Sequence, residues 1–109
     1  MDDNYNIITE TLHFEWSPEK RDINIKKHGI DFHEAASVFD DESAVVFDDP
    51  DHSYEEERFG IIGISSVGNV CLVIYCIRGE DERVRIISAR PATKREESAY
   101  INFNNRGGL

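Results

Sequence analysis

One stretch of the sequence, VCLVIYCI at residues 70–77, is apolar throughout. A short apolar run bounded by turn residues predicts a strand at the centre of a sheet, covered on both faces. The flanking segments, SSVGN at 65–69 and RGEDE at 78–82, both fit β-hairpin connections. Residues 58–64 and 83–90 are therefore predicted to be its antiparallel neighbours, and the three strands form a meander.

The rest of the chain predicts helices around this sheet. Residues 12–16 alternate apolar and polar side chains, as in a short strand, and Ser17-Pro18 then opens a helix that ends at Gly29. The sequence DFHE at 31–34 is a capping-box pattern for a second helix, which ends at residues 40–42. A further strand is expected at 44–47.

A second capping box, TKRE at 93–96, predicts a C-terminal helix to about Phe103. The expected fold is α+β, with two N-terminal helices, a four-stranded, mostly antiparallel sheet and a C-terminal helix. We expect one domain over residues 1–109, with its core at about 12–103, and flexible ends at 1–11 and 104–109.

The chain is strongly acidic, with a formal net charge of −10 over 109 residues. This charge argues against nonspecific binding of nucleic acid by the whole surface, and favours a basic protein partner. No apolar run is long enough to span a membrane, and the acidic N-terminus does not resemble a signal peptide, so a cytoplasmic protein is expected. Cys71 and Cys76 are predicted to face opposite sides of one strand, which excludes a disulfide between them.

Cations nevertheless gather at one junction, in the run RIISARPATKRE at 85–96. Strict alternation predicts one face of the strand with Arg83, Arg85, Ile87 and Ala89, and the other with Val84, Ile86, Ser88 and Arg90. Arg90 would then lie at the strand end, before the N-terminus of the last helix. Backbone amides and a guanidinium at such a place suit a phosphate. The alternative is that Arg90 pairs with an acidic neighbour.

Two further pairs of residues are candidates for chemistry. Lys27 and His28 end the first helix, where they can contact a phosphate and transfer a proton, or simply complement the helix dipole. Arg58 opens a strand directly after Glu57, which is a candidate base or orienting partner; the alternative is a solvated loop end. Trp16 is interpreted as a core anchor rather than a platform for a nucleobase.

The acidic stretch at residues 48–52 lacks the spacing of a calcium loop, and the histidines form no compact zinc motif. The sequence therefore predicts neither a metal nor another cofactor.

Taken in order, these motifs resemble the BrnT family of toxins. The resemblance rests on short motifs that extend from residue 14 to about residue 101: FEW with Pro18, KHGI with Phe32 and Glu34-Ala35, the acidic residues 48–51, ERF at 57–59 with Ile62-Gly63, RIISAR at 85–90, Ala92-Thr93, Arg95-Glu96 and Tyr100.

The resemblance implies a RelE-like fold and a metal-independent ribonuclease that arrests translation. It leaves open whether the RNA is free or bound to the ribosome. It also implies a BrnA-like antitoxin with a ribbon-helix-helix domain, through which alone the complex would contact operator DNA.

Carried over by position, the resemblance implies a set of site residues. The candidates for catalysis are Lys27, Arg58, Arg90, His28 and Glu57, and those for RNA binding are Arg85, Arg95 and Tyr100. Arg58 and Arg90 would hold the phosphate, while Lys27, His28 or Glu57 would act as base or acid.

One departure keeps other functions open, because RNA-cutting toxins are usually basic and this chain is acidic. A toxin-like module without catalytic activity, which binds the antitoxin and modulates operon repression, is the main alternative. A metal-dependent hydrolase that uses the acidic segment is a third hypothesis.

Overall fold

The computed structural model describes residues 5–8, 12–49 and 56–107. Its centre is a six-stranded sheet with the strand order β1-β2-β6-β5-β4-β3. The strands are β1 (Tyr5–Ile8), β2 (His13–Trp16), β3 (Val45–Asp48), β4 (Arg58–Ile64), β5 (Val70–Arg78) and β6 (Arg83–Pro91). The helices are α1 (Pro18–His28), α2 (Phe32–Ser37) with the 3₁₀ turn η1 (Val38–Asp40), and α3 (Lys94–Gly107).

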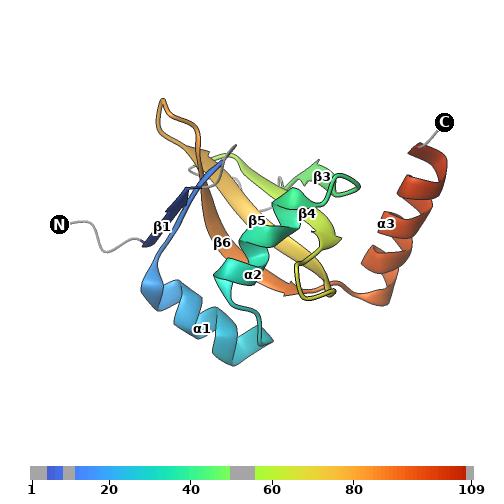
Figure 1. Ribbon diagram of the computed structural model, residues 1–109, viewed down its shortest axis with the longest axis horizontal. Coiled ribbons are helices and arrows are strands. Elements are labelled where there is room, and N and C mark those ends of the chain that lie inside the picture. Colours follow the sequence, from blue (N-terminus) through green and yellow to red (C-terminus); the bar gives the residue numbers. More distant parts are fainter. Residues whose placement is uncertain (1–4, 9–11, 50–55, 108–109) are drawn as a thin grey trace.

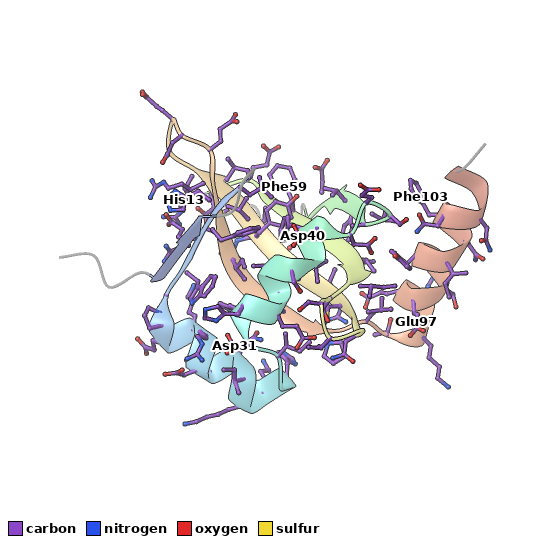
Figure 2. All side chains as sticks on the ribbon, in the orientation of Figure 1. His13, Asp31, Asp40, Phe59, Glu97 and Phe103 are labelled. Carbon is purple, nitrogen blue, oxygen red and sulfur yellow. The ribbon has the colours of Figure 1, made fainter. Side chains whose placement is uncertain are left out.

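The helices lie on both sides of the sheet. Helices α1 and α2 pack on one face, and α3 stands apart from them next to β3 and β4 (Figure 1; Figure 2 adds the side chains in the same orientation). The face under α1 and α2 holds the main core, where Phe14, Trp16 and Phe32 are at most 2% exposed. On the other face Tyr100 of α3 packs against Ile62 and Leu72. We call the face under α1 and α2 the inner face, and the other the outer face.

Aromatic rings hold α2 and η1 against the inner face. The Trp16 and Phe32 rings meet edge to face with centroids 6.0 Å apart, and the Phe39 ring contacts both Phe14 and Tyr75 in the same way. Such pairs add directional attraction to the burial of apolar surface. Trp16 is fully buried, which supports its interpretation as a core anchor.

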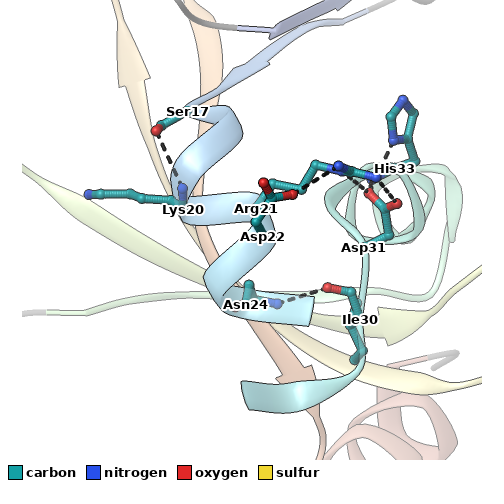
Figure 3. Close-up of polar contacts among 8 residues, drawn as sticks. All are labelled: Ser17, Lys20, Arg21, Asp22, Asn24, Ile30, Asp31 and His33. Atoms are coloured by element: carbon teal, nitrogen blue, oxygen red, sulfur yellow. Dashed lines mark hydrogen bonds and ion pairs between the residues drawn. The ribbon is translucent and has the colours of Figure 1, made fainter. Parts of the chain in front are cut away.

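The turn between α1 and α2 is held by ion pairs and a cap (Figure 3). Ser17 caps α1, and Gly29 ends it in the left-handed conformation with a φ of 74°, as predicted. The two carboxylate oxygens of Asp31 accept hydrogen bonds from Arg21 Nε and Nη2 at 3.0 and 2.9 Å. The Arg21 hydrogen bonds and the amide of His33 hold the pKa of Asp31 far below its usual range, although burial opposes them.

The capping box predicted at residues 31–34 forms only in part. The Asp31 side chain caps α2 by accepting from the His33 amide, but Glu34 makes different contacts. Its carboxylate accepts from Ser65 Oγ at 2.7 Å and Asn69 Nδ2 at 3.0 Å, which ties α2 to the β4–β5 turn. By contrast, the box predicted at residues 93–96 forms with both of its bonds, between Thr93 and Glu96.

The α+β class is correct, but the sheet differs from the prediction. It has six strands instead of four, since β2 joins it and β1 adds an edge. Strand β2 runs parallel to β6, and the long segment between them, which contains α1, α2, η1 and strands β3 to β5, gives the chain room to return in the same direction. Residues 5–8, predicted to be flexible, form β1, while the rest of segment 1–11 lies outside the described residues. Residues 104–107 continue α3 instead of forming a tail.

No helix in the part of the chain that the structure describes has the length and apolar character needed to cross a membrane.

Candidate active site

A bulge in β6 decides which side chains share the outer face. Ile74 of β5 lies opposite Ser88, while the next residue, Tyr75, lies opposite Ile86, so Ile87 is left without a partner across the ladder. An extra residue in one strand shifts the alternation of its side chains. Arg85 and Arg90 are five residues apart, yet their β5 partners, Cys76 and Leu72, are four apart and share a face.

The predicted alternation of β6 is therefore wrong beyond residue 86. Val84, Ile86 and Ala89 are buried in the inner core, whereas Arg83, Arg85, Ser88 and Arg90 share the outer face. The period-two pattern of a strand does not reveal a single extra residue. After such a residue, every side chain points to the face opposite the one that strict alternation predicts.

Arg58 reaches the same face from β4. It lies opposite Cys76, which in turn lies opposite Arg85, so one row across the sheet contains Arg58, Cys76 and Arg85. A parallel row contains Ile62, Leu72 and Arg90. Both arginines predicted to hold the phosphate, Arg58 and Arg90, thus stand on one face, in rows that lie four positions apart along β4 and β5.

A pocket of about 320 Å³ opens between these two rows and the start of α3. Its walls combine cationic, acidic, polar and apolar side chains, namely Arg58, Arg90, Asp49, Glu96, Ser88, Phe47, Leu72, Ile74 and Ile87. Arg58 and Arg90 are separated by 32 positions in the sequence, and the sheet brings both to this pocket. We take it as the candidate active site.

Arg90 is held at both ends of its guanidinium by one carboxylate. Its Nη1 and Nη2 donate to Glu96 Oε1 and Oε2 at 2.7 and 2.8 Å. The alternative that the sequence left open, a pairing of Arg90 with an acidic neighbour, is therefore realised. The hydrogen bonds from Arg90 lower the pKa of Glu96, and Glu96 raises the pKa of Arg90.

Glu96 is itself fixed by the start of α3. Its Oε1 also accepts the backbone amide of Thr93 at 2.9 Å, and its own amide donates to Thr93 Oγ1 at 3.1 Å. The carboxylate thus occupies the amide and guanidinium donors that the sequence assigns to a phosphate. Any phosphate at this end of the pocket must bind beside Glu96 or displace it.

Asn24 of α1 fixes the strand from the inner face, one residue before Arg90. Its Nδ2 donates to the carbonyl of Ala89 at 2.8 Å, and its Oδ1 accepts the Ala89 amide at 3.0 Å. The side chain also donates to the carbonyl of Ile30 at 2.9 Å. Asn24 is 5% exposed, and its amide gives Ala89 the pair of bonds that a neighbouring strand would otherwise supply.

Arg85, a predicted RNA-binding residue, is engaged with an acid. Glu15 of β2 is 2% exposed, and its two carboxylate oxygens accept from Arg83 Nη1 at 2.5 Å and Arg85 Nη1 at 2.7 Å. A buried carboxylate needs such partners. Arg85 therefore neutralises Glu15 at the β2 side of the sheet, outside the pocket.

The acid beside Arg58 is Glu56 instead of Glu57. Glu56 Oε1 lies 3.8 Å from Arg58 Nη2, and its Oε2 lies 2.9 Å from Arg78 Nη2. Glu57 is exposed and does not line the pocket. The sequence alone does not distinguish whether Glu56 or Glu57 turns toward the arginine.

The other predicted site residues lie away from the pocket walls. Lys27 and His28 end α1, a helix of the inner face, and Arg95 is exposed on α3. Tyr100 is 8% exposed and its hydroxyl donates to Asp41 Oδ2 at 2.7 Å. Burial and the Asp41 carboxylate raise the pKa of Tyr100 to about 12. These contacts anchor α3 to the sheet.

Metal binding has no support among residues 5–8, 12–49 and 56–107, where no group of three or more His, Cys, Asp or Glu side chains is arranged to hold an ion. The predicted acidic segment at 48–52 lies mostly outside the described residues, and of it the structure describes Asp48 and Asp49. Cys71 and Cys76 are both free thiols, in agreement with the sequence.

The elements that build the pocket fall within a recognised family. The family model of BrnT, the ribonuclease toxin of type II toxin–antitoxin systems, matches residues 16–96. The chain belongs to the BrnT family. The matched range contains Arg58, Arg90 and Glu96, whereas Tyr100 lies beyond it.

A solved structure supports the BrnT assignment. The chain is similar to the crystal structure of the Brucella abortus ribonuclease toxin, BrnT, with 31% sequence identity and a TM-score of 0.55. The similarity covers 72% of this chain and 94% of that chain. Among proteins of curated function, no sequence matches this chain. BrnT membership confirms the predicted toxin class, with RNA as substrate and an antitoxin as partner.

Sequence reasoning missed several residues of the BrnT-type pocket. Phe47 had no recognisable motif, Asp49 was noted only within the acidic stretch 48–52, and Ser88 was not singled out as a site residue. Glu96 was recognised as half of a capping box and as part of a family motif but not as a site residue, although its distance of six residues from Arg90 is short enough for contact across the strand–helix junction. Asn24, a polar residue in the middle of a helix, was the one available signal for a buried anchor.

Proposed function

We propose that this BrnT-family chain cleaves RNA without a metal ion, with Arg58 and Arg90 as the residues that bind the scissile phosphate. The observation that carries the proposal is that both arginines line one pocket of nucleotide size. An arginine binds phosphate through parallel hydrogen bonds and stays charged at any physiological pH.

The reaction uses the nucleophile of RNA itself. The 2′-hydroxyl attacks the adjacent phosphorus, the bond to the 5′-oxygen breaks, and a 2′,3′-cyclic phosphate and a 5′-hydroxyl result. Arginines beside the phosphate stabilise the extra negative charge of the transition state. A base must take the 2′-proton and an acid must protonate the leaving oxygen.

Asp49 is our candidate for the base. It is a pocket carboxylate beside Arg58, and its backbone amide donates to the Arg58 carbonyl at 2.9 Å. Lys27, His28 and Glu57, which the family resemblance implies for proton transfer, lie outside the pocket walls.

The test is cleavage of RNA by purified, antitoxin-free protein in excess chelator, with the ends of the products mapped. Cleavage that leaves cyclic phosphate ends and disappears in Arg58→Ala and Arg90→Ala variants is expected. Lys26→Ala is the matched control, since it removes one exposed cation from α1. Cleavage that requires an added divalent ion would overturn the proposed mechanism.

The proposed protein partner is the one that the BrnT family resemblance implies. We propose a BrnA-like antitoxin, with a ribbon-helix-helix domain that alone contacts operator DNA. The net charge of −10 supports a basic antitoxin segment as the part that contacts this chain.

A second function has a specific observation in its favour. Arg85 and Arg90 are both paired with carboxylates, as expected of a module that binds its antitoxin without cleaving RNA. Overproduction without growth arrest, together with no cleavage of free RNA or of message on translating ribosomes, would favour this module over the ribonuclease.

A further inference from the structure

The floor of the pocket has an uncharged row between its two arginines. Phe47 lies opposite Gly60, Gly60 opposite Ile74, and Ile74 opposite Ser88, so one row crosses β3, β4, β5 and β6. The Arg58 row lies on one side of it and the Arg90 row on the other. Successive rows on one face of a sheet are separated by about 7 Å.

The Phe47 ring lies over Gly60. A methyl group at residue 60 would overlap the Cζ, Cε1 and Cε2 atoms of that ring, so the ring rests directly against the glycine backbone. Phe47 is still 38% exposed, and it lines the pocket together with Leu72, Ile74 and Ile87. Gly60 therefore allows an aromatic ring to form part of the pocket wall beside the arginines.

We infer that Phe47, seated on Gly60, is the binding site for a nucleobase whose phosphate is held by Arg58 or Arg90. This inference rests on the proposed function, because it places the base next to the proposed phosphate site. A nucleobase is flat and apolar on its faces and stacks on an exposed aromatic ring whatever its sequence. The charged rows on either side suit the phosphates of the same strand.

Two ligands that differ only in the base test the inference. Adenosine 5′-monophosphate and ribose 5-phosphate carry the same sugar and phosphate, and their affinities for the full chain are measured by calorimetry. We expect the nucleotide to bind at least about tenfold more tightly, the contribution of one base stacked on an aromatic ring. Phe47→Ala should remove this preference and leave the affinity for ribose 5-phosphate unchanged.

Two further variants exclude a purely structural effect. Gly60→Ala keeps the ring but displaces it from its seat, and should reduce the preference for the nucleotide. Val46→Ala, a neighbour on β3 that is 55% exposed and outside the pocket, should keep it.

Equal affinities of the two ligands for the wild-type protein, or a full preference retained by Phe47→Ala, would overturn the nucleobase site. The same holds if Phe47→Ala loses affinity for both ligands. The proposed ribonuclease fails by a different result, namely affinity for ribose 5-phosphate that Arg58→Ala and Arg90→Ala leave unchanged.

Discussion

Arg90 and Glu96 form a two-point ion pair across the junction of β6 and α3, with oxygen–nitrogen distances of 2.7 and 2.8 Å. The pair joins the residue proposed to bind phosphate to the capping residue of the helix that follows. The charge of the arginine is thereby balanced before any substrate arrives, so RNA competes with an internal carboxylate.

Replacing Glu96 with Gln should strengthen phosphate binding. A glutamine at this position can still cap α3, but it no longer balances the charge of Arg90. Affinity for inorganic phosphate should rise by about fivefold, as expected for the loss of a partly exposed ion pair. Phosphate titration followed by NMR measures it, with Glu97→Gln, an exposed neighbour, as the control. Weaker binding by Glu96→Gln would show that the carboxylate positions Arg90 instead of competing with phosphate.

The Arg90–Glu96 pair should also make part of the free energy of unfolding sensitive to acid. The pKa of Glu96 is lower in the folded chain than in the unfolded chain, so the unfolded state binds more protons in the intervening pH range. Its stabilising contribution is complete above the unfolded pKa of about 4.3 and is lost as the pH falls through the lowered folded value. Urea unfolding between about pH 2 and 5 should show a flatter dependence in Glu96→Gln than in the wild type. Equal slopes would contradict this assignment.

Asn24→Ala should destabilise the fold by about 3 kcal/mol. The substitution leaves the amide and carbonyl of Ala89 and the carbonyl of Ile30 without their side-chain partner in a buried place. Chemical denaturation measures the change. Ile23→Ala, a neighbour on α1 that is 55% exposed, should cost much less. A loss as small as that of the control would mean that water replaces the Asn24 amide.

Tyr100 should ionise far above the ordinary range of tyrosine. Burial and the Asp41 carboxylate raise its pKa to about 12, and burial also raises the pKa of Tyr75, so Tyr100→Phe should remove one part of the late phenolate absorbance change and leave the part from Tyr75. Because its pKa is raised, neutral Tyr100 with its hydrogen bond to Asp41 contributes fully to the stability of the fold below the unfolded pKa of about 10. This contribution is lost as the pH rises toward 12. A Tyr100→Phe protein with an unchanged titration curve would refute the assignment.

Glu15→Ala should cost about 3 kcal/mol, because it leaves Arg83 and Arg85 together without the carboxylate that both contact. The measurement is the unfolding temperature of Glu15→Ala. The control is Glu19→Ala, which removes an exposed carboxylate at the start of α1. If both variants unfold at the same temperature, the two arginines find other partners.

The sequence predicted the elements that depend on local chemistry. The cap at Ser17, the stop at Gly29 and the box at residues 93–96 were identified correctly, because each uses side chains within a few positions of the backbone they bind. The meander of β4, β5 and β6 was also correct, since its turns are short.

The errors concern long-range or single-residue effects. The parallel pairing of β2 with β6 joins segments about seventy positions apart, and no local pattern specifies it. The bulge at Ile87 is one extra residue in an otherwise regular pattern, yet it moves Arg90 to the face of Arg58. For the site, the sequence named both pocket arginines but omitted the ring, the base candidate and the competing carboxylate.

The parallel pairing of β2 with β6 also limits how early the chain can complete its fold during translation. Glu15 leaves the ribosome early, but its partners Arg83 and Arg85 are translated about seventy residues later. Such distant pairings form late, because the chain between them must first be ordered. Arg90 of the candidate site follows Arg85 on the same strand, so incomplete chains released by interrupted translation lack both this ion-pair cluster and the complete pocket.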